Sequence, residues 1–171
     1  MSILTEALSV VVENRVLARR YPGGVAGFAR DCPNASFCTD GRLSRVGFLS
    51  PRDTRFFLGL LEAAQLHARG PARAPEVAVV DQNMGVLHPC LWIEFGHTED
   101  GLPVCWHAAH RPGRLAVPPD WRAEQASAFE TLPDVPFPRL MRYLRTEDRL
   151  DWYQNRRTGE LLFIDTPFVT H

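Results

Sequence analysis

Apolar and polar residues follow one another in patterns that predict three consecutive strands between positions 76 and 110. Residues 77–80 form a continuous apolar run, which is typical of a strand covered on both faces. Residues 90–95 and 104–109 alternate instead, as expected for strands with one buried face. Because the Asp100-Gly101 pair between them favours a tight turn, we expect these two strands to form a hairpin.

The register of this hairpin is predicted from burial, since a slip of one residue moves every side chain to the other face. We predict that Phe95 lies opposite Val104 and that Trp92 lies opposite His107. One face is then apolar and belongs to the core; it holds Leu91, Ile93, Phe95, Val104, Trp106 and Ala108. The other face gathers Cys90, Trp92, Glu94, Cys105 and His107.

Helical periodicity is clearest over residues 51–68, where Pro51 suits the first helical position. The predicted apolar stripe consists of Phe56, Phe57, Leu60, Leu61 and Ala64. A second helix is predicted over 121–130, with Asp120 as its N-cap. Turn residues predict further hairpins over 36–49 and 151–165.

The N-terminal segment gives conflicting signals. Residues 5–8 favour a helical turn, whereas the β-branched run 10–12 favours a strand. Asn14 could cap a short helix over 15–20. Together the elements predict a single α+β domain over 1–171. Its mostly antiparallel sheet has about five to seven strands, and helices 51–68 and 121–130 pack on it.

Composition excludes several kinds of chemistry. All 19 basic residues are arginine, so no P-loop lysine and no Schiff-base lysine can exist in this sequence. The formal net charge of −1 gives no global attraction for nucleic acid or for an anionic membrane. Four cysteines without Cys-x-x-Cys spacing, and no signal-peptide pattern, lead us to expect a cytoplasmic protein with reduced thiols.

The polar face of the central hairpin has three interpretations: a metal site, a nucleophilic cysteine, or buried side chains without a chemical role. Cys105 and His107, two residues apart, could join Cys90 and Glu94 as metal ligands, or His107 could activate a thiol as nucleophile. Buried cysteine also behaves as a small hydrophobe, and no ligand motif is present. We therefore expect no metal and no cofactor, and no catalytic residue is assigned.

Two further places on the predicted strands are candidates for binding. Asp81 and Gln82 end a buried strand, where ligand sites often gather, but Asp81 could equally accept hydrogen bonds from turn amides. Trp92 beside Glu94 is a candidate recognition aromatic, or a tryptophan covered by a helix. The predicted binding residues are thus Asp81, Gln82, Trp92, Glu94, Cys105 and His107.

Three stretches resemble a group of small stand-alone bacterial proteins of unknown function: Tyr21 to Phe28 (YPGGVAGF), Val79 to Gln82 (VVDQ) and Pro89 to Gly96 (PCLWIEFG). The resemblance implies a cytoplasmic bacterial protein and assigns no activity to any residue. The sequence contains no GxSxG, HExxH, GxGxxG or Walker A motif.

These observations favour a non-enzymatic protein-binding module, such as a regulator or a toxin-immunity protein, whose partner is another protein. The alternative is a small enzyme or ligand binder, hydrolase-like or metal-dependent, that uses the Cys/His/carboxylate cluster of the hairpin.

Overall fold

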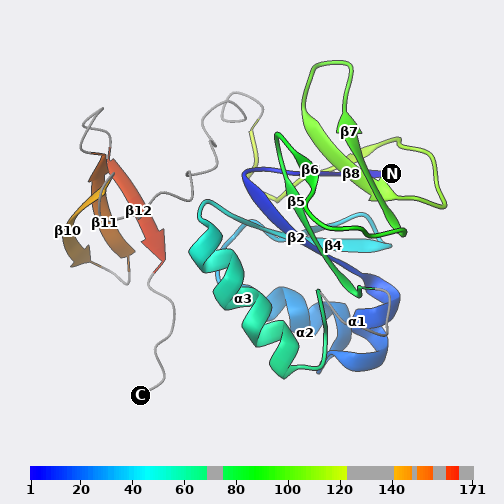
Figure 1. The fold of residues 1–171 in the computed structure, drawn as a ribbon, viewed down its shortest axis with the longest axis horizontal. Coiled ribbons are helices and arrows are strands. Elements are labelled where there is room, and N and C mark those ends of the chain that lie inside the picture. Colours follow the sequence, from blue (N-terminus) through cyan, green and yellow to red (C-terminus); the bar gives the residue numbers. More distant parts are fainter. Residues whose placement is uncertain (69–74, 123–140, 148–149, 156–160, 166–171) are drawn as a thin grey trace. The chain divides into compact units, whose positions relative to one another are not determined.

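The computed structural model of this 171-residue chain describes residues 1–68, 75–122, 141–147, 150–155 and 161–165 (Figure 1). Contacts within the chain divide it into two units, 1–132 and 133–171. The predicted α+β class with mostly antiparallel sheets is confirmed. The assignment of 1–171 to a single domain stays a prediction.

A five-stranded antiparallel sheet forms the centre of the first unit, in the order β3-β4-β2-β5-β6. Its strands are β2 (Leu8–Glu13), β3 (Cys38–Thr39), β4 (Leu43–Phe48), β5 (Val77–Asp81) and β6 (Gly85–Val86). The predicted 36–49 hairpin is confirmed as β3 and β4. In the turn between them the Asp40 carboxylate accepts hydrogen bonds from the amides of Arg42 and Leu43, both at 2.8 Å.

A four-stranded sheet in the order β7-β8-β1-β9 packs against the first. Its strands are β1 (Ser2–Leu4), β7 (Ile93–His97), β8 (Pro103–His107) and β9 (Leu115–Ala116). The chain therefore starts in this sheet and crosses into the other between β1 and β2. At the crossing Ala7 has φ 47°, a left-handed conformation that a non-glycine residue rarely adopts.

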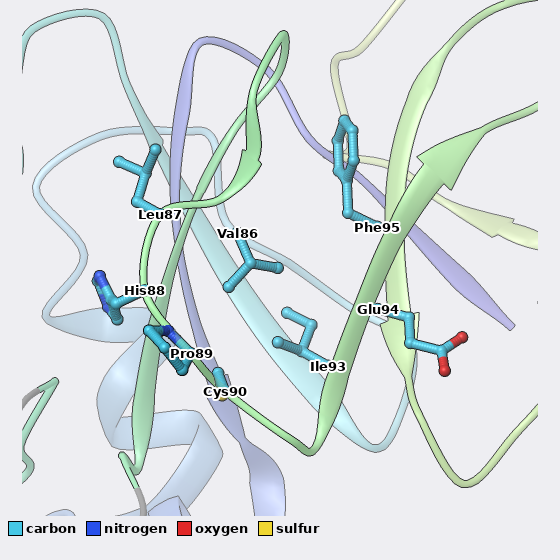
Figure 2. A pocket seen from close by; sticks show the side chains of 8 residues that line it. All are labelled: Val86, Leu87, His88, Pro89, Cys90, Ile93, Glu94 and Phe95. Atoms are coloured by element: carbon cyan, nitrogen blue, oxygen red, sulfur yellow. The ribbon is translucent and has the colours of Figure 1, made fainter.

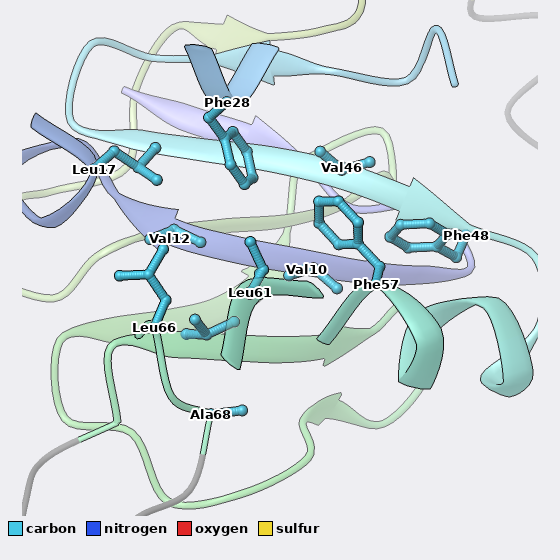
Figure 3. Packing of buried hydrophobic residues seen from close by; sticks show 11 residues of the cluster. Val10, Val12, Leu17, Phe28, Val46, Phe48, Phe57, Leu61, Leu66 and Ala68 are labelled. Carbon is cyan, nitrogen blue, oxygen red and sulfur yellow. The ribbon is translucent and has the colours of Figure 1, made fainter. Parts of the chain in front are cut away.

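Three helices cover the opposite face of the five-stranded sheet (Figures 1 and 3). They are α1 (Asn14–Arg20), α2 (Gly24–Arg30) and α3 (Pro51–Ala63). Because side chains alternate along a strand, Val10 and Val12 pack under the helices whereas Val11 packs between the two sheets. β5 is consequently buried on both faces along its whole length, as its continuous apolar run predicted.

Helix α3 begins as predicted but differs in length and in buried face. The Ser50 hydroxyl accepts a hydrogen bond from the Asp53 amide at 3.1 Å, and Pro51 is in the first turn. The helix ends at Ala63 rather than at position 68. Thr54, Phe57 and Leu61 form its buried face, which is narrower than the predicted stripe. Phe56 and Leu60 are 48% and 51% exposed, so their assignment to the core was wrong.

The predicted hairpin of the central segment forms, but its predicted register was wrong. Phe95 lies opposite Cys105 and Glu94 opposite Trp106, one residue away from the predicted pairing. The loop has the same register as the strands: the Thr98 amide donates to the Leu102 carbonyl at 2.9 Å and closes a three-residue loop, Glu99 to Gly101. The Trp106 ring then lies across Gly96, where an added Cβ would be 3.0 Å from it.

The observed register keeps the predicted inner face of β7 and reverses that of β8, so Cys105 faces inward where Trp106 was predicted to do so. Ile93, Phe95 and Cys105 face the five-stranded sheet, with Ile93 and Cys105 buried. Leu91, predicted to face the core, precedes the strand and is 93% exposed. The strands also differ from the predicted ranges, since β7 begins three residues later than expected and β8 ends two residues earlier.

The N-terminal segment forms strands β1 and β2, so the strand signal of 10–12 prevails over the helical signal of 5–8. α1 follows, although Asn14 is its first residue and not its cap. Of the helix predicted over 121–130, Trp121 and Arg122 are in irregular backbone and the remaining positions lie outside the described residues.

The second unit contains an antiparallel three-stranded sheet in the order β10-β11-β12. Its strands are β10 (Met141–Glu147), β11 (Leu150–Asn155) and β12 (Leu161–Asp165). The pairing of β11 with β12 confirms the C-terminal hairpin predicted from the sequence. The Arg145 guanidinium lies 5.5 Å from the centre of the Trp152 ring, within the range of a cation–π contact.

Candidate functional site

The observed register separates the residues that the sequence placed in one cluster. Glu94 points to the outer face of β7, where its carboxylate accepts a hydrogen bond from Trp106 Nε1 at 2.9 Å. Cys105 and His107 are on the inner face of β8. The Trp92 indole donates to the Pro75 carbonyl at 2.7 Å and packs against the core between the sheets. The structure therefore does not bring these side chains together as one site.

His107 instead meets a carboxylate that the sequence did not single out. Its Nε2 lies 3.1 Å from Glu13 Oε1, at the end of β2, and its Nδ1 accepts a hydrogen bond from the Ala109 amide at 3.1 Å. Because Nδ1 accepts a hydrogen bond, the ring proton is on Nε2, and Nε2 donates it to the Glu13 carboxylate. Arg15 also binds the Glu13 carboxylate, at 2.9 Å. Both ring nitrogens of His107 are thus occupied by structural partners.

The cysteines of this region are protected thiols. Cys105 is fully buried, and burial raises its pKa to about 12. Burial also raises the pKa of the Cys90 thiol to about 11. A nucleophilic cysteine needs a lowered pKa, so neither thiol has the property that would make it reactive.

Asp81 and Gln82 bind the backbone of their own neighbourhood. The Asp81 carboxylate accepts hydrogen bonds from the amides of Asn83 and Met84 at 2.7 and 3.0 Å, which is the turn role considered for it. The side-chain oxygen Oε1 of Gln82 accepts a hydrogen bond from the Ala7 backbone N–H at 2.8 Å. The Gln82 backbone N–H donates to the Ala7 carbonyl at 2.9 Å. Gln82 therefore holds the left-handed residue at which the chain passes from one sheet to the other.

A buried arginine dominates the polar interior between the sheets. Arg45 is 0% exposed and donates from Nε to the Ser9 hydroxyl at 2.9 Å. Its guanidinium also donates to the Ser36 and Glu6 carbonyls. The carboxylate of Glu6 lies 3.8 Å away and accepts the Trp121 indole N–H at 2.6 Å. Because these partners surround it, Arg45 has a structural role in joining β4 to the crossing segment.

An open groove of about 540 Å³ lies where the edges of the two sheets meet. One wall is β6 and the segment after it, and the other is β7; the lining residues are Val86, Leu87, His88, Pro89, Cys90, Ile93, Glu94 and Phe95. Figure 2 shows the Val86 and Ile93 side chains between the two walls and Glu94 directed away on the far side of β7. The Val86 and Ile93 side chains therefore give the groove an apolar part, although its lining as a whole is about as polar as it is apolar.

Gly85 sets the spacing between the two walls. A Cβ added at Gly85, which has φ +80°, would lie 3.0 Å from the Phe95 ring. Glycine at this position satisfies the left-handed turn and lets the Phe95 ring lie against the backbone of β6. The contact holds the first residue of β6 beside the middle of β7.

Exposed apolar side chains occur on one lining residue of the groove, Leu87, and on two residues next to lining or wall residues in the chain, Leu91 and Met84. Leu87 and Leu91 are 42% and 93% exposed, and Met84, in the turn before β6, is 78% exposed. Of the six predicted binding residues only Glu94 lines the groove. The sequence offered one signal for an irregular segment at this groove, since Leu87 and Leu91 lie on either side of His88-Pro89 and proline is disfavoured inside a strand.

Among the residues that the structure describes, no group of three or more His, Cys, Asp or Glu side chains is arranged to hold a metal ion. Within the same residues, no helix has the length and apolarity needed to cross a bilayer. Comparisons of the chain with protein-family models, with curated proteins and with solved structures give no significant match.

Proposed function

We propose that this chain is a cytoplasmic, non-enzymatic protein-binding module of the regulator or toxin-immunity type, and that its partner docks at the groove between β6 and β7. The observation that carries the proposal is the exposure of two leucines: Leu87, which lines the groove, and Leu91, which follows the lining residue Cys90 in the chain. Exposed apolar side chains gathered around a concave surface are typical of interaction sites.

The energetic argument concerns Leu91 in particular. Its side chain is almost fully exposed, and burying a leucine stabilises a contact by about 1.5–3 kcal/mol. Trp92 is anchored by the Pro75 carbonyl, which fixes the backbone next to Leu91. A partner that covers Leu91 and Leu87 therefore gains apolar burial while little of this segment has to be ordered.

The alternative, a small enzyme or ligand binder built on the Cys/His/carboxylate cluster, has less support. The register places Glu94 on the face opposite to Cys105 and His107. The pKa of the Cys105 thiol is raised to about 12 by burial, and both His107 nitrogens are engaged.

Site-specific photo-cross-linking tests the proposal. A benzophenone amino acid replaces Leu91 in one variant and Glu62, an exposed residue of α3, in a matched control, both made in the cell that naturally produces the chain. We expect a discrete cross-linked protein from position 91 and not from position 62. The purified partner should bind the unmodified chain stoichiometrically, and Leu91→Asp should weaken that binding by tenfold or more, equivalent to about 1.4 kcal/mol.

Two results would overturn the proposal: no cross-linked protein specific to position 91, or a partner whose affinity is unchanged by Leu91→Asp. Circular dichroism of Leu91→Asp serves as the folding control. Because Leu91 is 93% exposed, the substitution should leave the melting temperature unchanged.

A further inference from the structure

β7 is an edge strand of the four-stranded sheet, in the strand order of the part of the chain that the structure describes. An edge strand presents backbone N–H and C=O groups that no neighbouring strand has paired. Natural proteins usually protect such edges with Lys, Pro, a bulge or a covering segment. The sequence of β7, Ile-Glu-Phe-Gly-His, contains neither Lys nor Pro.

The hydrogen bonds at both ends of the hairpin determine which groups of β7 point outward. The Ala108 amide donates to the Trp92 carbonyl and the Thr98 amide donates to the Leu102 carbonyl, both at 2.9 Å. In an antiparallel pair, residues that hydrogen-bond to the partner strand alternate with residues that do not. Trp92 and Thr98 bond to the partner, so Glu94 and Gly96 between them also direct their backbone groups to β8. Ile93, Phe95 and His97 therefore direct theirs to the free side.

The groove beside this edge sets a pattern for the side chains of an added strand. Residues of a strand alternate between two faces with a period of two. Side chains on the inner face of an added strand would enter the groove beside the apolar side chains of Val86 and Ile93. Those on the outer face would lie next to Glu94, and toward the turn next to Glu99 and Asp100, all three of which are exposed.

Charge decides which occupant fits. A second copy of β7 paired along this edge would bring two Glu94 residues and two acidic turns near one another, and like charges in neighbouring strands are destabilising. Lys or Arg at the outward positions of a partner strand would instead pair with Glu94 and the turn carboxylates.

We propose that the partner binds by strand addition to β7, as an extended segment with apolar residues at alternate positions and Lys or Arg between them. This inference rests on the proposed function and specifies its mode of recognition. The outward N–H and C=O groups of Ile93, Phe95 and His97 supply the main-chain hydrogen bonds, and the groove and Glu94 supply specificity.

The probe is an acetylated, amidated peptide of alternating Arg and Val residues, measured against the full chain by fluorescence anisotropy. Two control peptides are a Glu-Val alternating peptide and a peptide of the same Arg and Val composition with the residues in two blocks. We expect binding by the Arg-Val alternating peptide, at least tenfold weaker binding by both controls, and inversion of the Arg/Glu preference in Glu94→Arg.

A matched pair of variants isolates the backbone donor. His97→Pro removes an outward amide without removing a bond to β8, whereas His97→Ala keeps that amide. We expect roughly tenfold weaker peptide binding for His97→Pro than for His97→Ala, corresponding to about one hydrogen bond. Equal affinities in two variants of equal melting temperature would overturn strand addition.

Amide hydrogen exchange gives an independent test, because it distinguishes the β7 residues whose amides point outward from those whose amides are bonded to β8. On peptide binding, the amides of Ile93, Phe95 and His97 should exchange more slowly, while those of Glu94 and Gly96, already bonded to β8, should change little. No added protection at the three odd-numbered amides would overturn the inference. If the partner cross-linked at position 91 also leaves those amides unprotected, strand addition fails although the proposed function stands.

Discussion

His107 Nε2 and Glu13 Oε1 lie 3.1 Å apart, and this contact joins the last residue of β2 in one sheet to the last residue of β8 in the other. The two residues are 94 positions apart in the chain. The Glu13 side chain is only 5% exposed, so it depends on protein partners for its hydrogen bonds.

We expect His107→Ala to lower the free energy of unfolding by about 1–3 kcal/mol, because it removes a donor from a buried carboxylate. Urea unfolding followed by circular dichroism measures the change. His67→Ala, at an exposed histidine, is the control and should stay within about 0.5 kcal/mol of the wild type. Equal losses in the two variants would contradict a structural role for the His107–Glu13 contact.

Adjacent leucines of α3 should respond very differently to truncation. Leu61 is 1% exposed in the core under the helices, so Leu61→Ala should cost about 2–5 kcal/mol. Leu60 is 51% exposed, and Leu60→Ala should change stability by less than about 0.5 kcal/mol. Chemical denaturation of both variants checks this, and a large loss for Leu60→Ala would show that its side chain is covered.

Two helical glycines offer a second matched pair. A Cβ at Gly27 in α2 would be 1.9 Å from the Pro22 carbonyl oxygen, whereas a Cβ at Gly59 in α3 meets no atom within 4 Å. Gly27→Ala should therefore lower the melting temperature. Gly59→Ala should raise stability by about 0.5–1 kcal/mol, because alanine has the higher helix propensity. Scanning calorimetry distinguishes the two, and shifts in the same direction would count against this packing.

Stability should fall at alkaline pH because buried thiols resist ionisation. Burial raises the pKa of Cys105 and Cys32 from 9.0 to about 12. Above pH 9 the unfolded chain loses these protons and the folded chain keeps them, so the free energy of unfolding decreases as pH rises. The slope approaches about 1.4 kcal/mol per pH unit for each thiol and vanishes well below pH 9.

Urea unfolding at a series of pH values from 7 upward measures this dependence. Cys105→Val removes one of the thiols and should give a shallower decline above pH 9 than the wild type. A decline of the same steepness in Cys105→Val would assign the alkaline loss to other groups. Tyr21, whose pKa burial raises to about 12, contributes with the same sign at higher pH.

The sequence by itself determined the features that depend on neighbouring residues. The apolar run of β5 predicted its burial on both faces, and Ser50-Pro51 predicted the start of α3. Turn residues located the β3–β4 hairpin, and the Asx role of Asp81 was one of two local alternatives. Each of these depends on backbone preference or on hydrogen bonds within a few residues, which a single segment already specifies.

Only the tertiary structure decided the register of β7 with β8, the buried face of α3 and the position of the groove. Alternating side chains fit a hairpin in either register until a second sheet covers one face, and here that sheet covers Ile93 together with Cys105, whereas Trp106 was predicted to face the core. The His107–Glu13 contact and the groove between β6 and β7 join segments that are distant in the chain or belong to different sheets. Their geometry follows from how two sheets pack, and pairwise spacing along the sequence does not contain that information.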